Sequence, residues 1–146
     1  MISTIYIING PNLNLLGKRE IDIYGSISFE EFFDSLKNEF PGIRLEYFQS
    51  NHEGFLIDKI QEVGFEKNTG IILNAGGLSH TSISLRDAVA AVLTPVVEVH
   101  ISNINKREPF RKHSFLTEVC EAHFIGLGLE GYRLSIHWLL ESSFNK

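Results

Sequence analysis

The feature that most constrains the fold is a regular alternation between short apolar runs and segments whose apolar residues recur with a helical period. Consecutive apolar residues are typical of strands buried on both faces of a parallel sheet. Units that alternate strand and helix connect through right-handed crossovers, which place helices on both faces of that sheet. The apolar runs predict five strands, at Ser3–Ile8, Ile43–Gln49, Gly70–Asn74, Val96–Ile101 and about Cys120–Ile125.

The segments between these runs carry apolar stripes at helical spacing. The first begins at Ser28, which forms a capping-box pattern with Glu31, and Ser50 with Glu53 repeats the pattern before the second. The four predicted stripes are Phe29, Phe32, Phe33, Leu36 and Phe40; Leu56, Ile60 and Val63; Leu85, Ala88, Val89 and Val92; and the segment from Glu130 to about Phe144.

Five strands joined by crossover helices suit a flavodoxin-like α/β fold, a doubly wound five-stranded parallel sheet in the order 2-1-3-4-5. No repeat, linker or low-complexity tract divides the 146 residues, so we expect a single domain over residues 1–146. A chain of this length buries enough surface on folding to form its own core.

The composition indicates which partners and which cellular compartment to expect. Thirteen basic against eighteen acidic side chains give a net charge of −5, which argues against a nucleic-acid partner. The single cysteine, Cys120, has no partner for an internal disulfide, which favours a reducing compartment. No targeting signal is visible, and polar residues interrupt every apolar stretch well below the length of a membrane span. We expect a cytoplasmic protein with no membrane partner.

Polar side chains follow the first, third and fourth predicted strands. The first runs into Asn9-Gly10-Pro11-Asn12, the third into "NAGGLSHTS" (residues 74–82), and the fourth into "EVHISN" (residues 98–103). In an open parallel sheet, ligands bind beyond the carboxyl ends of the strands, near the point where strand order reverses. These polar groups therefore predict a site at one edge of the sheet.

Glu98 and His100 lie two residues apart on the fourth strand, so their side chains project from the same face. A carboxylate beside an imidazole fixes its tautomer and stabilises its protonated form, as a general acid requires. A purely structural hydrogen bond at the end of a strand explains the pair equally well.

The segment from Gly17 to Gly25, which we call the lid, carries Arg19 and Tyr24 between two glycines that allow it to open and close. A neighbouring guanidinium favours the ionised form of a phenol, which makes Tyr24 a candidate base. Spacing alone favours the plainer interpretation, a mobile surface loop.

Two further segments offer groups for an anion. Among the basic residues at 106–112, a guanidinium can hold a carboxylate through two parallel bonds, and Arg111 is the preferred candidate. The "AGGLSHTS" segment offers backbone amides at a helix start, with His80 and Ser82 as side-chain donors. A solvated turn explains each segment taken alone.

Metal and covalent schemes find little support. The six histidines show no HExxH spacing, Cys120 and His123 form only a lone pair, and no GxSxG or desolvated lysine is present. GxGxxG and GxxxxGK[ST] are also absent, so no dinucleotide or triphosphate cradle is predicted. The main alternative is a flavodoxin-like module that binds a flavin or another phosphate-bearing ligand, although "GPNLNLLG" lacks the hydroxyls typical of such loops.

Five blocks, "NGPNLNLLGKRE…YG", "QSNHEG", "NAGGLSHTS", "EVHISN" and "REPFRKHS", resemble the signature of type II 3-dehydroquinate dehydratase in order and spacing. The resemblance covers essentially the whole chain. It implies a flavodoxin-like homo-dodecamer, a tetramer of trimers. It implies a hydro-lyase that converts 3-dehydroquinate to 3-dehydroshikimate in the shikimate route to chorismate and aromatic amino acids. It also implies no metal, no organic cofactor and no Schiff base.

The same resemblance assigns residue roles. Tyr24 matches the base, Arg19 the group that keeps it ionised, Asn12 the holder of a water at the enolate oxygen, and His100, oriented by Glu98, the acid. The substrate-binding positions that match are Asn74, His80, Ile101, Ser102 and Arg111, with Asp87 contributed across a subunit contact.

Two positions depart from the family pattern. Ile21 stands where many members have proline, and Leu78 where an aromatic residue is usual. Neither removes a catalytic group, and the intact Arg19–Tyr24–His100 set argues against an inactive relative kept as a scaffold.

Overall fold

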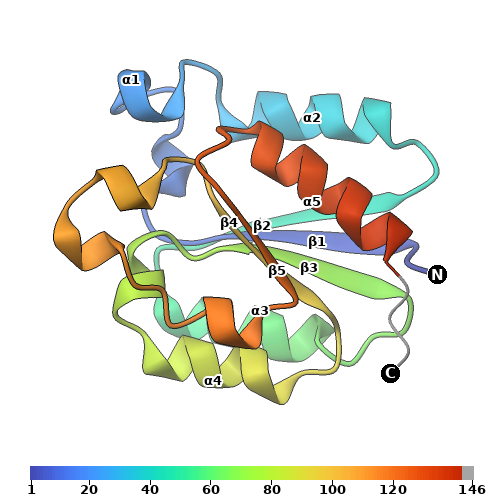
Figure 1. Cartoon of the computed structure of the whole chain (residues 1–146). Helices are drawn as coiled ribbons and strands as arrows, with labels where there is room; N and C mark the ends of the chain where they lie inside the picture. Colours follow the sequence, from blue (N-terminus) through green and yellow to red (C-terminus); the bar gives the residue numbers. More distant parts are fainter. Residues whose placement is uncertain (143–146) are drawn as a thin grey trace.

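The computed structural model describes residues 1–142, and its five strands form one parallel sheet in the order β2-β1-β3-β4-β5 (Figure 1). The predicted fold class and strand order are confirmed, and the predicted strand bounds differ only at their ends. The strands are β1 (Thr4–Asn9), β2 (Arg44–Gln49), β3 (Thr69–Asn74), β4 (Val96–His100) and β5 (Ala122–Ile125).

Helices cover both faces of the sheet. On one face lie α2 (Phe29–Glu39) and α5 (Glu130–Glu141), and on the other lie α3 (Glu53–Val63) and α4 (Ile83–Ala91) (Figure 1). The last predicted helix ends at Glu141, and its expected end at Phe144 lies outside the described residues. A short helix that the sequence pattern did not predict, α1 (Ile21–Tyr24), forms within the lid.

Neighbouring residues of each inner strand pack into different cores. On β1, Ile7 lies in the cluster formed with α2 and α5, whereas Ile8 lies in the cluster formed with α3 and α4. Both side chains are fully buried. Because each face of a strand needs an apolar side chain under its covering helix, the strands read as continuous apolar runs in the sequence.

One capping prediction is confirmed and one is wrong. Ser28 caps α2 by accepting a hydrogen bond from the backbone N–H of Glu31 at 3.2 Å. Ser50 does not cap α3, because that helix begins at Glu53 and its N-cap is His52. The Ser50 hydroxyl instead accepts from the backbone N–H of His52 at 3.0 Å.

The register of the sheet brings the polar strand ends together. Asn9 on β1 pairs with Asn74 on β3, and Leu73 pairs with Glu98 on β4. Beyond this edge lie the lid, at the upper left of Figure 1, and most of the short 3-10 helices, on the left of the molecule. The 3-10 helices are Leu13–Leu15, Gly76–His80, Ile104–Lys106, Pro109–Arg111 and Thr117–Val119.

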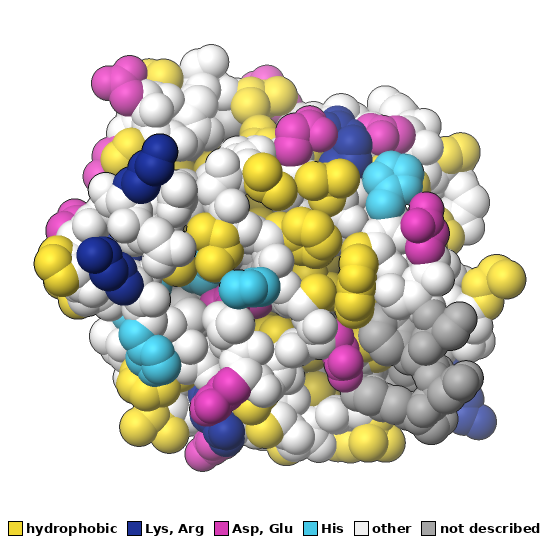
Figure 2. Space-filling view, in the orientation of Figure 1, with side chains coloured by type: hydrophobic (Ala, Val, Ile, Leu, Met, Phe, Trp, Pro, Cys, Tyr) yellow, Lys and Arg dark blue, Asp and Glu magenta, His cyan; other side chains and the backbone are white. Residues whose placement is uncertain are grey.

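The face of the molecule drawn in Figure 2 shows no broad patch of one charge among the described residues. On the face in Figure 2, the Lys and Arg side chains of the described residues are interspersed with Asp and Glu, and hydrophobic side chains gather over α5 and the edge strand β5. None of the helices within residues 1–142 has the length and apolar character needed to cross a bilayer.

Candidate active site

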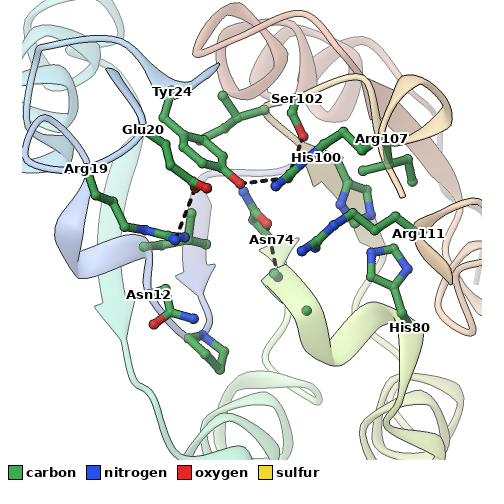
Figure 3. Close-up of a pocket in the computed structure, with 16 residues that line it drawn as sticks. Asn12, Arg19, Glu20, Tyr24, Asn74, His80, His100, Ser102, Arg107 and Arg111 are labelled. Carbon is green, nitrogen blue, oxygen red and sulfur yellow. Dashed lines mark hydrogen bonds and ion pairs between the residues drawn. The ribbon is translucent and has the colours of Figure 1, made fainter. Parts of the chain in front are cut away.

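A cavity of about 160 Å³ opens at the carboxyl edge of the sheet, between the lid and the loops that follow β1, β3 and β4 (Figure 3). The short elements around it bring together side chains that are far apart in the sequence. The predicted site residues that line the cavity are Asn12, Arg19, Tyr24, Asn74, His80, His100, Ile101, Ser102 and Arg111.

The inner wall of the cavity is built on β4. Glu98 is fully buried, and its Oε2 accepts a hydrogen bond from Nε2 of His100 at 2.7 Å. The same oxygen accepts from the Ser114 hydroxyl, and Oε1 accepts from the Thr117 hydroxyl at 2.5 Å. Burial raises the pKa of the Glu98 carboxyl, but these hydrogen bonds and the charge of His100 outweigh it and bring the pKa below its ordinary value. Glu98 is therefore an ionised carboxylate near neutral pH.

An ionised Glu98 determines what His100 can do. The carboxylate fixes the tautomer by accepting from Nε2, so Nδ1 is the ring nitrogen left for a ligand. His100 lines the cavity and is only 5% exposed, so its partner is shielded from solvent. The predicted Glu98–His100 pair is confirmed, and its geometry suits an imidazolium that gives up a proton into the cavity.

His80 stacks on His100, with ring centroids 5.9 Å apart. Its Nδ1 donates to the backbone carbonyl of His113 at 2.7 Å. Burial lowers the pKa of His80, and the neighbouring charges of His100 and Arg111 lower it further against the opposing effect of that hydrogen bond. A neutral His80 whose Nδ1 donates to His113 offers Nε2 as an acceptor.

The outer wall of the cavity is the lid. Arg19 forms an ion pair with Glu20 at 3.1 Å, and both side chains are exposed to about two fifths. The Arg19 guanidinium carbon lies 5.4 Å from the centre of the Tyr24 ring, over its face and not at its hydroxyl. Glu20 adopts a left-handed backbone conformation with φ of 44°. Gly25 ends α1 with φ of 83° and ψ of 176°, a conformation that only glycine readily adopts.

Arg107, not Arg19, is the guanidinium bonded to the Tyr24 hydroxyl. Its Nη1 donates to that oxygen at 2.8 Å and to the Ser102 hydroxyl at 3.2 Å, so it joins the lid to the loop after β4 (Figure 3). The sequence placed Arg107 among four basic residues and preferred Arg111. That preference was for a carboxylate clamp, and no spacing signalled the Arg107–Tyr24 contact: Glu108 lies 2.5 Å from Nε of Arg111 and 3.9 Å from Nε of Arg107, so both arginines share it as a counter-ion.

The "QSNHEG" block holds the loop after β1. Asn12 has a left-handed backbone with φ of 71°, and its N–H donates to Oδ1 of Asn51 at 3.0 Å. Gln49 donates to the same oxygen and to the backbone carbonyl of Gly10, both at 3.2 Å. The ends of β1 and β2 are thus joined, and Asn12 is held at the cavity wall.

The model of the family described as "Dehydroquinase class II" matches residues 3–140. The chain belongs to the class II dehydroquinase family. Among its relatives, the 3-dehydroquinate dehydratase of Chlorobaculum tepidum is 48% identical over 139 residues, covering 94% of each chain. The 3-dehydroquinate dehydratase of Bacillus pumilus is 50% identical over 136 residues, covering 92% of each chain. The crystal structure of the type II dehydroquinase of Butyrivibrio crossotus matches with a TM-score of 0.92 at 44% identity, over 96% of this chain and 99% of that one.

Two residues named from the sequence lie away from the cavity of this class II dehydroquinase. Asp87 is on α4, outside the cavity wall, where it pairs with Arg86 at 3.1 Å. The prediction that Ser82 is a ligand donor is wrong: its hydroxyl accepts from the N–H of Leu85 to cap α4 and donates to Glu53 at 2.6 Å. A serine at a helix N-cap is already engaged by the backbone.

Neither of the two departures from the family pattern lines the cavity. Ile21 is the first residue of α1 and is 53% exposed, so it contributes little packing to the lid. Leu78 lies in the 3-10 helix after β3 and packs against the core formed with α3 and α4. Within residues 1–142, no group of three or more His, Cys, Asp or Glu is placed to hold a metal ion.

Proposed function

We propose that this chain is a type II 3-dehydroquinate dehydratase, which removes water from 3-dehydroquinate by trans elimination through an enolate to give 3-dehydroshikimate. The observation that carries the proposal is one small cavity with a phenol bound to a guanidinium on one side and a carboxylate-backed imidazole on the other. Membership of the class II dehydroquinase family and the names of its relatives support the same reaction.

The first step is removal of a proton from the carbon beside the ketone. Such a proton is weakly acidic, so the reaction needs a positioned base and a polarised ketone oxygen. Tyr24 acts as the base in its phenolate form, which Arg107 stabilises through the hydrogen bond to its oxygen and Arg19 stabilises from the ring face. Asn12 holds a water against the developing enolate oxygen. Loss of one such donor typically raises a barrier by about 2.7–4 kcal/mol.

The second step expels the hydroxyl from the next carbon. Hydroxide is a poor leaving group, so His100 protonates this oxygen as the carbon–oxygen bond breaks, and the enolate collapses to the conjugated enone and water. Glu98 stabilises the imidazolium before transfer. Tyr24 returns its proton to solvent and His100 takes one back, so the enzyme needs no metal, organic cofactor or imine.

The remaining predicted residues hold the substrate. Arg111 offers its guanidinium to the substrate carboxylate, and Ser102 and the Ile101 backbone lie beside it. Asn74 and His80 bind ring hydroxyls from the floor of the cavity. Asp87 reaches the cavity of a neighbouring subunit in a homo-dodecamer, which agrees with its place outside the cavity of its own chain. We propose that residues 1–146 work as one domain in the cytoplasm, in the shikimate route to chorismate.

The decisive experiment is an ultraviolet assay of purified, assembled protein for the conjugated enone produced from 3-dehydroquinate. We expect absorbance to rise with enzyme concentration, and borohydride added during turnover to trap no adduct. No absorbance change would refute the proposed reaction. A visible cofactor spectrum in the purified protein would favour the flavin-binding alternative.

A further inference from the structure

Beneath the cavity floor, three buried side chains from different elements form one hydrogen-bonded chain. Asn74 at the end of β3 donates from Nδ2 to the hydroxyl of Tyr132 on α5 at 2.8 Å. The Tyr132 hydroxyl donates to Oδ1 of Asn9 at the end of β1 at 2.9 Å. Tyr132 and Asn9 are fully buried, and only Asn74 reaches the cavity.

The chain of donors fixes the orientation of the Asn74 amide. The backbone N–H of Gly76 can only donate, and it donates to Oδ1 of Asn74 at 3.2 Å, so the amide oxygen faces Gly76. The amide nitrogen must then face Tyr132, whose oxygen accepts because its own hydrogen is directed at Asn9. One of the two hydrogens of Nδ2 is used by Tyr132, and the second remains for a ligand oxygen.

Nothing else in the neighbourhood replaces the Tyr132 hydroxyl. Its ring packs edge-on against Phe29 and Phe32, with centroids 5.0 Å and 6.1 Å away, so the core on that side is apolar. The Asn9 side chain also interacts with the buried Tyr47 hydroxyl, so Asn9 links two tyrosines beneath the floor. Loss of the hydroxyl would leave the Asn74 Nδ2 and the Asn9 Oδ1 without this partner and leave the Asn74 amide held only by the Gly76 N–H, so the amide could shift.

We propose that Tyr132 is a positioning residue for the dehydratase reaction: its hydroxyl orients the Asn74 amide so that an N–H donor faces a substrate hydroxyl. The inference rests on the proposed function for its kinetic effect, but the orientation itself is a property of the protein alone. Tyr132 touches no substrate and acts only through Asn74, so it should affect substrate binding more than the chemical steps.

The test is Tyr132→Phe, assayed with 3-dehydroquinate. We expect KM to rise about tenfold, because an oriented hydrogen bond to the substrate is weakened, while kcat changes by less than about threefold. The matched control is Ser135→Ala. Ser135 is fully buried on the same helix, and its hydroxyl donates to the backbone carbonyl of Gly131 at 2.7 Å and not to the Asn74 amide, so its loss should leave KM unchanged.

A double-mutant cycle separates positioning from general loss of packing. In an Asn74→Ala background, Tyr132→Phe should change KM by less than about twofold, because the residue through which it acts is gone. An equal, additive effect of Tyr132→Phe in both backgrounds would overturn the proposal. If Tyr132→Phe fails to fold, Asn9→Leu replaces it in the same cycle, since it removes the acceptor that directs the Tyr132 hydrogen away from Asn74.

Crystal structures of the wild-type protein and of Tyr132→Phe provide a readout that does not depend on activity. We expect the Asn74 amide to shift in the variant and to stay in place in Ser135→Ala. An unmoved Asn74 amide in Tyr132→Phe would refute the positioning role even if the wild-type protein had no dehydratase activity. Wild-type inactivity by itself would refute the proposed function and leave the orientation to be judged by these structures.

Discussion

The two walls of the cavity are built differently. On the β4 wall, Glu98 and His100 are buried, and three donors hold the carboxylate. On the lid, the Arg19 and Glu20 side chains are exposed to 39% and 40%, and they pair mainly with each other. The β4 wall is held by buried donors, whereas on the lid the Tyr24 ring packs against the core formed with α2 and α5 and its hydroxyl accepts from Arg107 (Figure 3).

The difference separates two requirements of an elimination. An acid must keep its proton on one nitrogen until the leaving group is in place, and this needs a shielded and oriented imidazole. The base must leave the cavity entrance open for the substrate and then contact the carbon–hydrogen bond, and a segment that closes after binding meets both needs. The exposed isoleucines of the lid, Ile21 and Ile23, show how little packing opposes such movement.

The largest expected effect tests whether both walls are essential. Tyr24→Phe and His100→Ala should each lower kcat by about 10²–10⁴-fold, since each removes a proton-transfer group. The walls should differ in stability: His100→Ala deprives buried Glu98 of a donor and lowers the free energy of unfolding by about 1–3 kcal/mol. Tyr24→Phe, on the lid, should change it by less than about 0.5 kcal/mol. Turnover assays and urea unfolding measure both, and near-normal turnover in either variant would overturn that residue's role.

The next largest effect concerns the link between the walls. Arg107→Gln should lower kcat about 10²-fold, because the Tyr24 oxygen loses a charged donor where negative charge must be held. Arg107→Lys should lose less, since a charge remains. Arg133→Gln is the control: Arg133 also pairs with carboxylates, from Glu39 and Glu130, but lies on α5 away from the cavity. Equal kcat values for Arg107→Gln and the wild type would show that Arg19 alone supports the base.

The β4 wall and the sheet could be predicted because their signals are local. A buried parallel strand requires apolar residues on consecutive positions, and side chains two apart on a strand share a face. Glu98 and His100 followed directly from that spacing, and the strand order followed from alternation with helices. The wrong prediction of a cap at Ser50 shows the limit of local patterns. The helix begins at Glu53, so Ser50 lies in the loop before it although its sequence fits a capping box.

The contacts of the lid could not be predicted fully because they join residues that are far apart in the sequence. Arg107 meets Tyr24 across 83 positions of sequence, and no spacing rule connects the two. Ser114 and Thr117 likewise reach Glu98 across 16 and 19 positions of sequence, Ser114 from a loop and Thr117 from the start of the 3-10 helix Thr117–Val119. The family resemblance pointed to most of the residues that line the cavity, whereas the side chains that hold those residues became visible only in three dimensions.

Ser114→Ala and Thr117→Val test whether the β4 wall depends on its donors. Each should lower the free energy of unfolding at pH 7 by about 1–3 kcal/mol, because the buried carboxylate loses a hydrogen bond. The pKa of Glu98 is lowered in the folded protein, so its contribution is present above the ordinary value of 4.5 and is lost as the pH falls through the folded pKa. Each variant raises that pKa, so its stability should fall less steeply on acidification. Urea unfolding at pH 7 and pH 4 measures both effects, and unchanged values would show that His100 alone holds the carboxylate.

The smallest effect tests the backbone of the lid. Gly25 has φ of 83° and ψ of 176°, with nothing within 4 Å of an added Cβ, so Gly25→Ala introduces backbone strain without a clash. Because the lid is exposed, it should relieve the strain by moving, which displaces Tyr24 and lowers kcat/KM about tenfold with little change in Tm. The control is Gly54→Ala on α3, where a Cβ also meets nothing and helix propensity should add up to about 1 kcal/mol of stability. A drop in Tm without loss of kcat/KM in Gly25→Ala would mean that the lid does not move to relieve the strain and contributes to the stability of the fold as the β4 wall does.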